Sequence, residues 1–222
     1  MEVSSISIWG DSIGKGVVFD EARGRYAILP DNCVSQLKRA LRCPVENHAF
    51  MGCTALKGEA RMTDDEMRAG GVAAIEFGGN DCDMPWAAIS ENPDGEHQPN
   101  VTIVEFKRTM GRMVRRVRDA GMVPVMVTPP PLDAERYFRW VSRNLNAAAI
   151  LRYLGDVQFI YRWQERYAAA VRDIAAATGC RLLDLRDAFL SQHRVADLLC
   201  IDGIHPNAAG HRLIADAILA AV

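Results

Sequence analysis

Short apolar runs alternate along the chain with longer stretches in which apolar residues recur at helical spacing. The runs have the length of buried strands, and several stop at glycine or proline; they occupy residues 6–9, 44–47, 71–77, 122–127 and 181–185. The helical spacing appears at residues 33–41, 106–117, 158–177 and 206–221. Strands that alternate with helices predict βαβ units and therefore a parallel sheet covered by helices.

The number and order of these elements predict a single domain over residues 1–222. We expect an α/β fold, with a five-stranded parallel sheet at the centre of a three-layer α/β/α sandwich. In such folds the ligand-binding site forms beyond the carboxyl ends of the strands. Two long stretches, residues 78–100 and 128–156, are expected to be irregular and to form the walls of a pocket at that edge.

The composition is that of an ordinary globular protein, with 49% hydrophobic and 24% charged residues. The formal net charge of −2 argues against a generic nucleic-acid-binding protein, which usually carries a basic excess. No apolar run approaches the roughly 18–20 residues needed to span a bilayer. The first residues lack the basic and apolar segments of a signal peptide, so we expect a cytoplasmic protein. The six cysteines form no Cys-x-x-Cys pair, and we expect no metal site.

Residues suited to catalysis occur in four blocks that directly follow a predicted strand or precede a predicted helix. Each block alone is typical of an ordinary turn, helix cap or loop. In chain order they are Gly-Asp-Ser-Ile at 10–13, Asn-His-Ala-Phe-Met-Gly-Cys-Thr at 47–54, Gly-Gly-Asn-Asp at 78–81 and Asp-Gly-Ile-His-Pro-Asn at 202–207. Because the carboxyl ends of parallel strands meet at one edge of a sheet, we expect the first three blocks to lie close together.

In this order the four blocks resemble those of the SGNH hydrolases, also called GDSL esterases or lipases. The family's nucleophilic serine matches Ser12, and its Asp-x-x-His pair matches Asp202 and His205. The two residues of its oxyanion hole match Gly52 and Asn80, and the backbone N–H of the serine is the third donor. The resemblance extends from residue 6 to the C-terminus and implies the flavodoxin-like SGNH hydrolase fold. The chain departs from common members after the serine and before the glycine, at positions that carry no catalytic group.

The matched residues predict a serine esterase that needs no cofactor. His205 would accept the proton of Ser12, Asp202 would orient His205, and an acyl-Ser12 intermediate would then be hydrolysed by water. No lid helix is evident, so we expect a short acyl group such as acetyl. Aromatic residues in the two long stretches favour a carbohydrate ester. A thioesterase, a lysophospholipase and an inactive binding module remain alternatives.

Four further residues are expected to contact the substrate, namely Asp11, Asp81, Trp86 and Tyr137. Each lies within or beside one of the blocks or long stretches. The expected partner is a small-molecule ester, with no nucleic acid and no membrane span. Oligomers are common among enzymes of this kind, but no residue pattern in the chain indicates a homo-oligomer.

Overall fold

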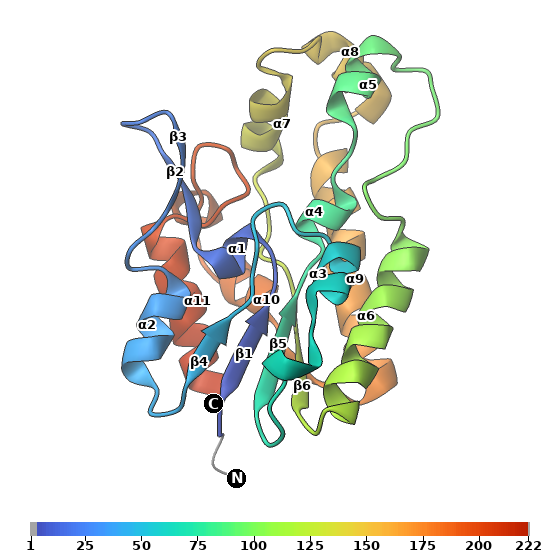
Figure 1. Cartoon of the computed structure of the whole chain (residues 1–222). Helices are drawn as coiled ribbons and strands as arrows, with labels where there is room; N and C mark the ends of the chain where they lie inside the picture. Colours follow the sequence, from blue (N-terminus) through green and yellow to red (C-terminus); the bar gives the residue numbers. More distant parts are fainter. Residues whose placement is uncertain (1–3, 222) are drawn as a thin grey trace.

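The computed structural model describes residues 4–221, apart from the side chain of Asp64, and a parallel sheet lies at its centre (Figure 1). The five strands lie in the order β4-β1-β5-β6-β7, and every neighbouring pair is parallel. They are β1 (Ile6–Trp9), β4 (Val45–Asn47), β5 (Val72–Glu76), β6 (Val123–Val127) and β7 (Arg181–Leu183). The predicted five-stranded parallel sheet is confirmed.

The last strand ends two residues earlier than the sequence pattern predicts. The side chain of Asp184 accepts a hydrogen bond from the backbone N–H of Asp187 at 3.1 Å and so caps α10 (Leu185–Leu190). A carboxylate that satisfies a free N–H group at a helix start stabilises the helix over a continued strand. The prediction of a strand through residue 185 is therefore wrong at its end.

Helices cover both faces of the sheet (Figure 1). One face packs against α2 (Cys33–Ala40), α10 and α11 (Ala208–Ala221). The other face packs against α3 (Ala55–Arg61), α6 (Ile103–Asp119) and α9 (Phe159–Thr178). This arrangement is the predicted three-layer sandwich.

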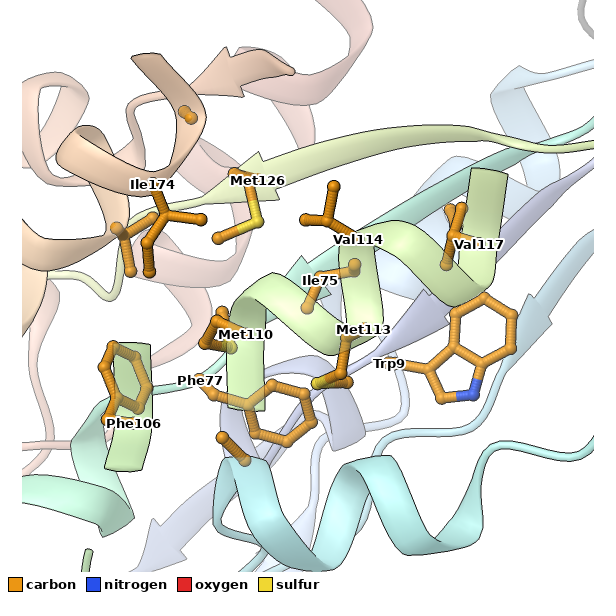
Figure 2. Close-up of a cluster of buried hydrophobic side chains, with 14 of the residues drawn as sticks. Trp9, Ile75, Phe77, Phe106, Met110, Met113, Val114, Val117, Met126 and Ile174 are labelled. Atoms are coloured by element: carbon orange, nitrogen blue, oxygen red, sulfur yellow. The ribbon is translucent and has the colours of Figure 1, made fainter. Parts of the chain in front are cut away.

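An apolar stripe on α6 forms much of the core on its side of the sheet. Figure 2 shows Met110, Met113, Val114 and Val117 of this helix facing the sheet residues Ile75 and Met126. Burying each such side chain contributes about 1.5–3 kcal/mol. This packing therefore stabilises the sheet, and the first three sequence blocks lie at the carboxyl edge of that sheet.

The two stretches that were expected to be irregular contain four short helices, so that expectation is wrong. They are α4 (Gly79–Cys82), α5 (Trp86–Glu91), α7 (Ala134–Ser142) and α8 (Ala147–Leu154). The side chains of Asp133 and Asn146 cap α7 and α8. Figure 1 shows α5, α7 and α8 above the sheet. Apolar residues of these three helices pack together, and this packing stabilises helices too short to be stable alone.

A β-hairpin that the sequence pattern did not predict stands beside the same edge of the sheet (Figure 1). Strands β2 (Val17–Asp20) and β3 (Arg25–Ile28) pair antiparallel, and the ring of Phe19 lies 4.7 Å from that of Trp140 on α7. The remaining elements are α1 (Ser12–Lys15), η1 (Asp64–Glu66) and η2 (Val195–Leu198). None of the helices within residues 4–221 has the length and hydropathy to cross a membrane.

Candidate active site

Ser12 is the first residue of α1, a single helical turn that begins just after β1. The Oδ1 atom of Asp11 caps this turn by accepting a hydrogen bond from the backbone N–H of Ile13 at 2.9 Å. Gly16 ends the turn with a φ of +85°, a left-handed conformation that favours glycine, and leads the chain into β2. The local sequence therefore fixes Ser12 at the carboxyl end of an inner strand of the sheet.

Three side chains far apart in the sequence meet in a hydrogen-bonded line. The Oγ atom of Ser12 lies 2.9 Å from Nε2 of His205, and Nδ1 of His205 lies 2.6 Å from Oδ2 of Asp202. Burial opposes ionisation of Asp202, but its hydrogen bond with His205 and the charge of His205 outweigh this effect and lower its pKa. Asp202 is thus a carboxylate that can accept the Nδ1–H and leave Nε2 free to accept the proton of Ser12.

The turn between Asp202 and His205 is held from two sides. The Oδ1 atom of Asp202 accepts hydrogen bonds from the backbone N–H groups of Ile204 and His205, both at 3.1 Å. Gly203 has a φ of +78°, and a Cβ atom there would lie 2.7 Å from the backbone oxygen of Asp133. Only glycine fits this contact, in which the carbonyl of Gly203 also accepts a hydrogen bond from the N–H of Asp133 at 2.8 Å.

Two of the predicted oxyanion-hole residues, Gly52 and Asn80, each have an N–H group that a bound molecule could reach. Gly52 has a φ of +72°, and a Cβ atom there would meet nothing within 4 Å, so a bound molecule can approach its backbone. Asn80 lies in α4, where its Nδ2 atom donates a hydrogen bond to Oδ2 of Asp11 at 2.9 Å. This bond fixes the amide and leaves its second N–H without a partner among the residues that the structure describes.

The predicted residues surround one cavity of about 190 Å³ at the carboxyl edge of the sheet. Ser12, Gly52, Asn80 and His205 line it, whereas Asp202 is fully buried behind His205. Three aromatic side chains from the hairpin, α5 and α7 form further parts of the wall: Tyr26, Trp86 and Tyr137. Among the described side chains, no group of three or more His, Cys, Asp or Glu is placed to hold a metal ion.

The sequence matches the family model of the GDSL-like lipase/acylhydrolase family over residues 8–213. The chain belongs to this family. The match covers almost the whole chain and includes all four blocks. It confirms the predicted resemblance and the predicted class, a carboxylic ester hydrolase. A comparison with curated proteins found no match.

Solved structures with the fold of this GDSL hydrolase include several esterases. The lipase/acylhydrolase from Enterococcus faecalis has 20% sequence identity and a TM-score of 0.69, with 99% of this chain and 95% of that chain covered. The acetyl xylan esterase AlAXEase has 17% identity and a TM-score of 0.66, with 98% and 99% covered. A mutant of Axe2, an acetyl-xylooligosaccharide esterase from Geobacillus, has 20% identity and a TM-score of 0.66, with 98% and 93% covered. At these identities the likeness shows the common fold.

Two of the four residues expected to contact substrate of the GDSL hydrolase lie on the open wall of the cavity. Trp86 and Tyr137 are both lining residues, and their rings meet edge to face at 6.2 Å. Asp11 also borders the cavity, but it is almost completely buried and both its oxygens are engaged, with Ile13 and Asn80. Asp11 is therefore placed to orient the side chain of Asn80.

Asp81, the fourth of these residues, lies behind the cavity wall and is not among the lining residues. Its side chain is fully buried, and its oxygens accept hydrogen bonds from the N–H groups of Ala55 at 2.8 Å and Gly78 at 3.1 Å. Burial raises the pKa of Asp81 to about 7. Asp81 thus joins the start of α3 to the start of α4 in the GDSL hydrolase, and the structure does not bring it to the substrate.

Tyr26 is a site residue that sequence reasoning missed. Its ring centroid lies 5.0 Å from that of His205, and it lines the same cavity as Ser12. Burial, and then the charge of Asp202, raises the pKa of Tyr26, so the phenol keeps its proton. The residue reaches His205 only because the unpredicted hairpin folds back over the edge of the sheet.

Glu76 is a second residue that sequence reasoning missed. It lies at the end of β5, is almost completely buried, and neither side-chain oxygen accepts a hydrogen bond from a donor group of the described residues. Burial, and then the neighbouring charge of Asp11, raises the pKa of Glu76 well above its ordinary value. The sequence signal that could have identified Glu76 was an acidic residue within an otherwise apolar predicted strand.

We expect Glu76→Gln to stabilise the GDSL hydrolase increasingly as the pH rises. Glutamine has nearly the same size and shape as glutamate but cannot ionise. In the native enzyme the pKa of Glu76 is higher in the folded state than in the unfolded state. The free energy of unfolding is therefore highest below the unfolded-state pKa and declines as the pH rises above it. The loss is about 1.4 kcal/mol per pH unit until the folded-state pKa is passed. Thermal unfolding at pH 5 and pH 8 should show a larger advantage of the variant at pH 8.

The exposed Glu91 supplies the matched control for this comparison. Glu91→Gln makes the same chemical change at the end of α5, where solvent surrounds the side chain. Its effect on the unfolding temperature should be small and the same at both pH values. An equal effect of Glu76→Gln at pH 5 and pH 8 would contradict the assignment of a proton to Glu76.

Proposed function

We propose that the protein is a serine esterase that hydrolyses a short acyl ester, such as an acetyl ester, carried by a carbohydrate. The observation that carries the proposal is the hydrogen-bonded line from Ser12 through His205 to Asp202 at the wall of the cavity. An activated serine next to oxyanion donors is the arrangement that acyl transfer requires. Membership of the family supports ester hydrolysis as the reaction.

In the first half of the proposed reaction, Oγ of Ser12 attacks the ester carbonyl carbon while its proton moves to Nε2 of His205. The negative charge that develops on the carbonyl oxygen is stabilised by the N–H groups of Ser12 and Gly52 and by the side chain of Asn80. His205 then donates the proton to the leaving alcohol oxygen as the ester C–O bond breaks. Asp202 stabilises the imidazolium that exists between the two transfers.

In the second half, water replaces the alcohol. His205 removes a proton from the water, the resulting hydroxide attacks the carbonyl carbon of acyl-Ser12, and the same three donors hold the oxyanion. The proton on His205 returns to Oγ of Ser12 as the acyl–oxygen bond breaks, and the carboxylic acid leaves. The residues end in their starting protonation states, so the chain needs no cofactor for this cycle.

The size of the cavity supports a short acyl group. About 190 Å³ must hold the acyl group and the adjoining part of the alcohol next to Ser12. Trp86 of α5 and Tyr137 of α7 form part of the wall around this space. A long acyl chain would have to displace packed side chains of these helices.

The walls of the cavity support a carbohydrate as the alcohol. Tyr26, Trp86 and Tyr137 present aromatic surface beside the nucleophile. Aromatic rings with a polar tip bind molecules that combine apolar and hydroxyl-bearing surface. Two of the structurally similar proteins are acetyl xylan esterases, whose substrates are acetyl esters on a sugar chain.

A panel of esters tests the proposal. We expect kcat/KM for acetylated xylo-oligosaccharide and p-nitrophenyl acetate to exceed that for p-nitrophenyl octanoate by at least about tenfold, because the longer chain does not fit the cavity. An acetyl thioester and a lysophospholipid complete the panel. Hydrolysis of only the octanoate, the thioester or the lysophospholipid would contradict the proposed substrate. If none is hydrolysed and no fluorophosphonate adduct forms, the protein is a binding module.

A further inference from the structure

Asp83 is a carboxylate held rigidly at the rim of the catalytic cavity. It directly follows α4, and its Oδ1 atom accepts three hydrogen bonds: from the backbone N–H of Met84 at 3.0 Å, from Nε1 of Trp86 at 2.8 Å and from the hydroxyl of Tyr137 at 2.6 Å. Burial, and then the charge of Asp83, raises the pKa of Tyr137 well above its ordinary value, so this hydroxyl remains a donor. One oxygen of Asp83 is therefore saturated and fixed.

The second carboxylate oxygen of Asp83 is free. Oδ2 accepts no hydrogen bond from the described residues, and it is not one of the unpaired polar atoms that are shielded from solvent. Asp83 lines the catalytic cavity and also an adjoining open hollow of about 310 Å³. A polar atom that is fixed, unpaired and open at the junction of two hollows is placed to bind a ligand.

The surroundings of this oxygen define the ligand chemistry. Trp86 and Tyr137 belong to both hollows, and Trp140 adds a further ring to the outer one. The outer hollow is also lined by Arg143. An acceptor framed by aromatic rings fits a hydroxyl-bearing ring or polyol, whose C–H surface contacts the rings while one O–H points at the acceptor.

We propose that Oδ2 of Asp83 accepts a hydrogen bond from a hydroxyl group of the alcohol portion of the substrate, next to the scissile ester. Asp83 then determines specificity by selecting polyhydroxylated alcohols over hydroxyl-free ones. This inference rests on the proposed esterase function and adds to it a defined group in the substrate. Ser12, His205 and Asn80 perform the chemistry, and Asp83 acts only on the alcohol.

The variant Asp83→Asn tests this inference with little structural change. The Oδ1 atom of asparagine can keep all three of its hydrogen bonds, while the free position becomes an N–H donor in place of an acceptor. The matched control is Asp94→Asn, which makes the same change at an exposed aspartate later in the same connecting segment. Unfolding temperatures of both variants verify that they fold.

Two acetyl esters with the same ring size provide the comparison. Methyl 2-O-acetyl-xyloside carries hydroxyl groups beside the ester, whereas tetrahydropyran-3-yl acetate carries none. At pH 8 we expect Asp83→Asn to lower kcat/KM for the xyloside by about 10- to 100-fold, since the affected hydrogen bond has a charged acceptor. The hydroxyl-free acetate should change less than about twofold, and Asp94→Asn should change neither.

Equal losses for the two esters, or no loss for the xyloside, would overturn the role of Asp83. A binding measurement decides the matter even without turnover. Each ester is titrated calorimetrically into Ser12→Ala and into the double variant Ser12→Ala with Asp83→Asn. The double variant should bind the xyloside more weakly and should bind the hydroxyl-free acetate equally well. If the native enzyme hydrolyses neither ester, the proposed function fails separately, while this titration still tests Asp83.

Discussion

Ser12→Ala is expected to abolish ester hydrolysis while leaving the fold intact. The Oγ atom of Ser12 is the only oxygen on the chain that His205 Nε2 contacts within the described residues, so its removal leaves no nucleophile for an acyl intermediate. We expect kcat/KM to fall by about 10,000-fold or more. The unfolding temperature should change little, because the hydroxyl makes a single hydrogen bond.

Intact mass after treatment with a fluorophosphonate probe tests the same group directly. The native enzyme should gain one adduct, and Ser12→Ala should gain none. Ser191→Ala, which removes an exposed hydroxyl remote from the cavity, should label and hydrolyse like the native enzyme. An adduct that persists in Ser12→Ala would show that another residue is the nucleophile and would contradict the proposed mechanism.

Asn80→Ala has the second largest expected effect, a decrease in kcat of about 100- to 1,000-fold with a KM close to the native value. The amide of Asn80 is expected to donate to charge that exists only in the transition state, so its loss should affect turnover more than substrate binding. Steady-state kinetics with p-nitrophenyl acetate give both constants. This substrate has no sugar hydroxyl, which keeps the measurement independent of Asp83.

The control for Asn80 is Asn92→Ala, at the exposed end of α5. Its kinetic constants should equal those of the native enzyme. A higher KM with unchanged kcat in Asn80→Ala would mean that Asn80 binds the ground state and does not stabilise the transition state. A large loss of stability in Asn80→Ala would instead identify its bond to Asp11 as structural.

The positions of the four blocks in the fold could be predicted because each depends on short-range sequence. A strand that ends in glycine followed by Asp-Ser fixes both the position of the turn and the residue that caps it, as Asp11 and Ile13 show. The Asp-x-x-His turn likewise brings its own two residues together. The parallel sheet then gathers the blocks at one edge, which the alternation of strands and helices predicts.

The substrate walls could not be predicted in the same way, because they depend on contacts between distant segments. Asp83 and Tyr137 are 54 residues apart, and nothing in either local sequence indicates their hydrogen bond. The hairpin that carries Tyr26 is four residues long on each strand, and its packing on α7 stabilises it. Short helices such as α7 likewise form through tertiary packing, which periodicity in one segment does not reveal.

The close contact at Gly203 connects the turn that positions His205 to the helix that limits the size of the alcohol in the cavity. The backbone of Gly203 lies directly against Asp133 and Tyr137 at the start of α7, so the turn that holds His205 and the helix that carries one cavity wall form a single unit. Moving α7 outward to admit a bulkier alcohol would move His205, the proposed general base, away from Ser12. Adaptation to larger substrates, by evolution or by engineering, is therefore expected to proceed through the hairpin side of the cavity.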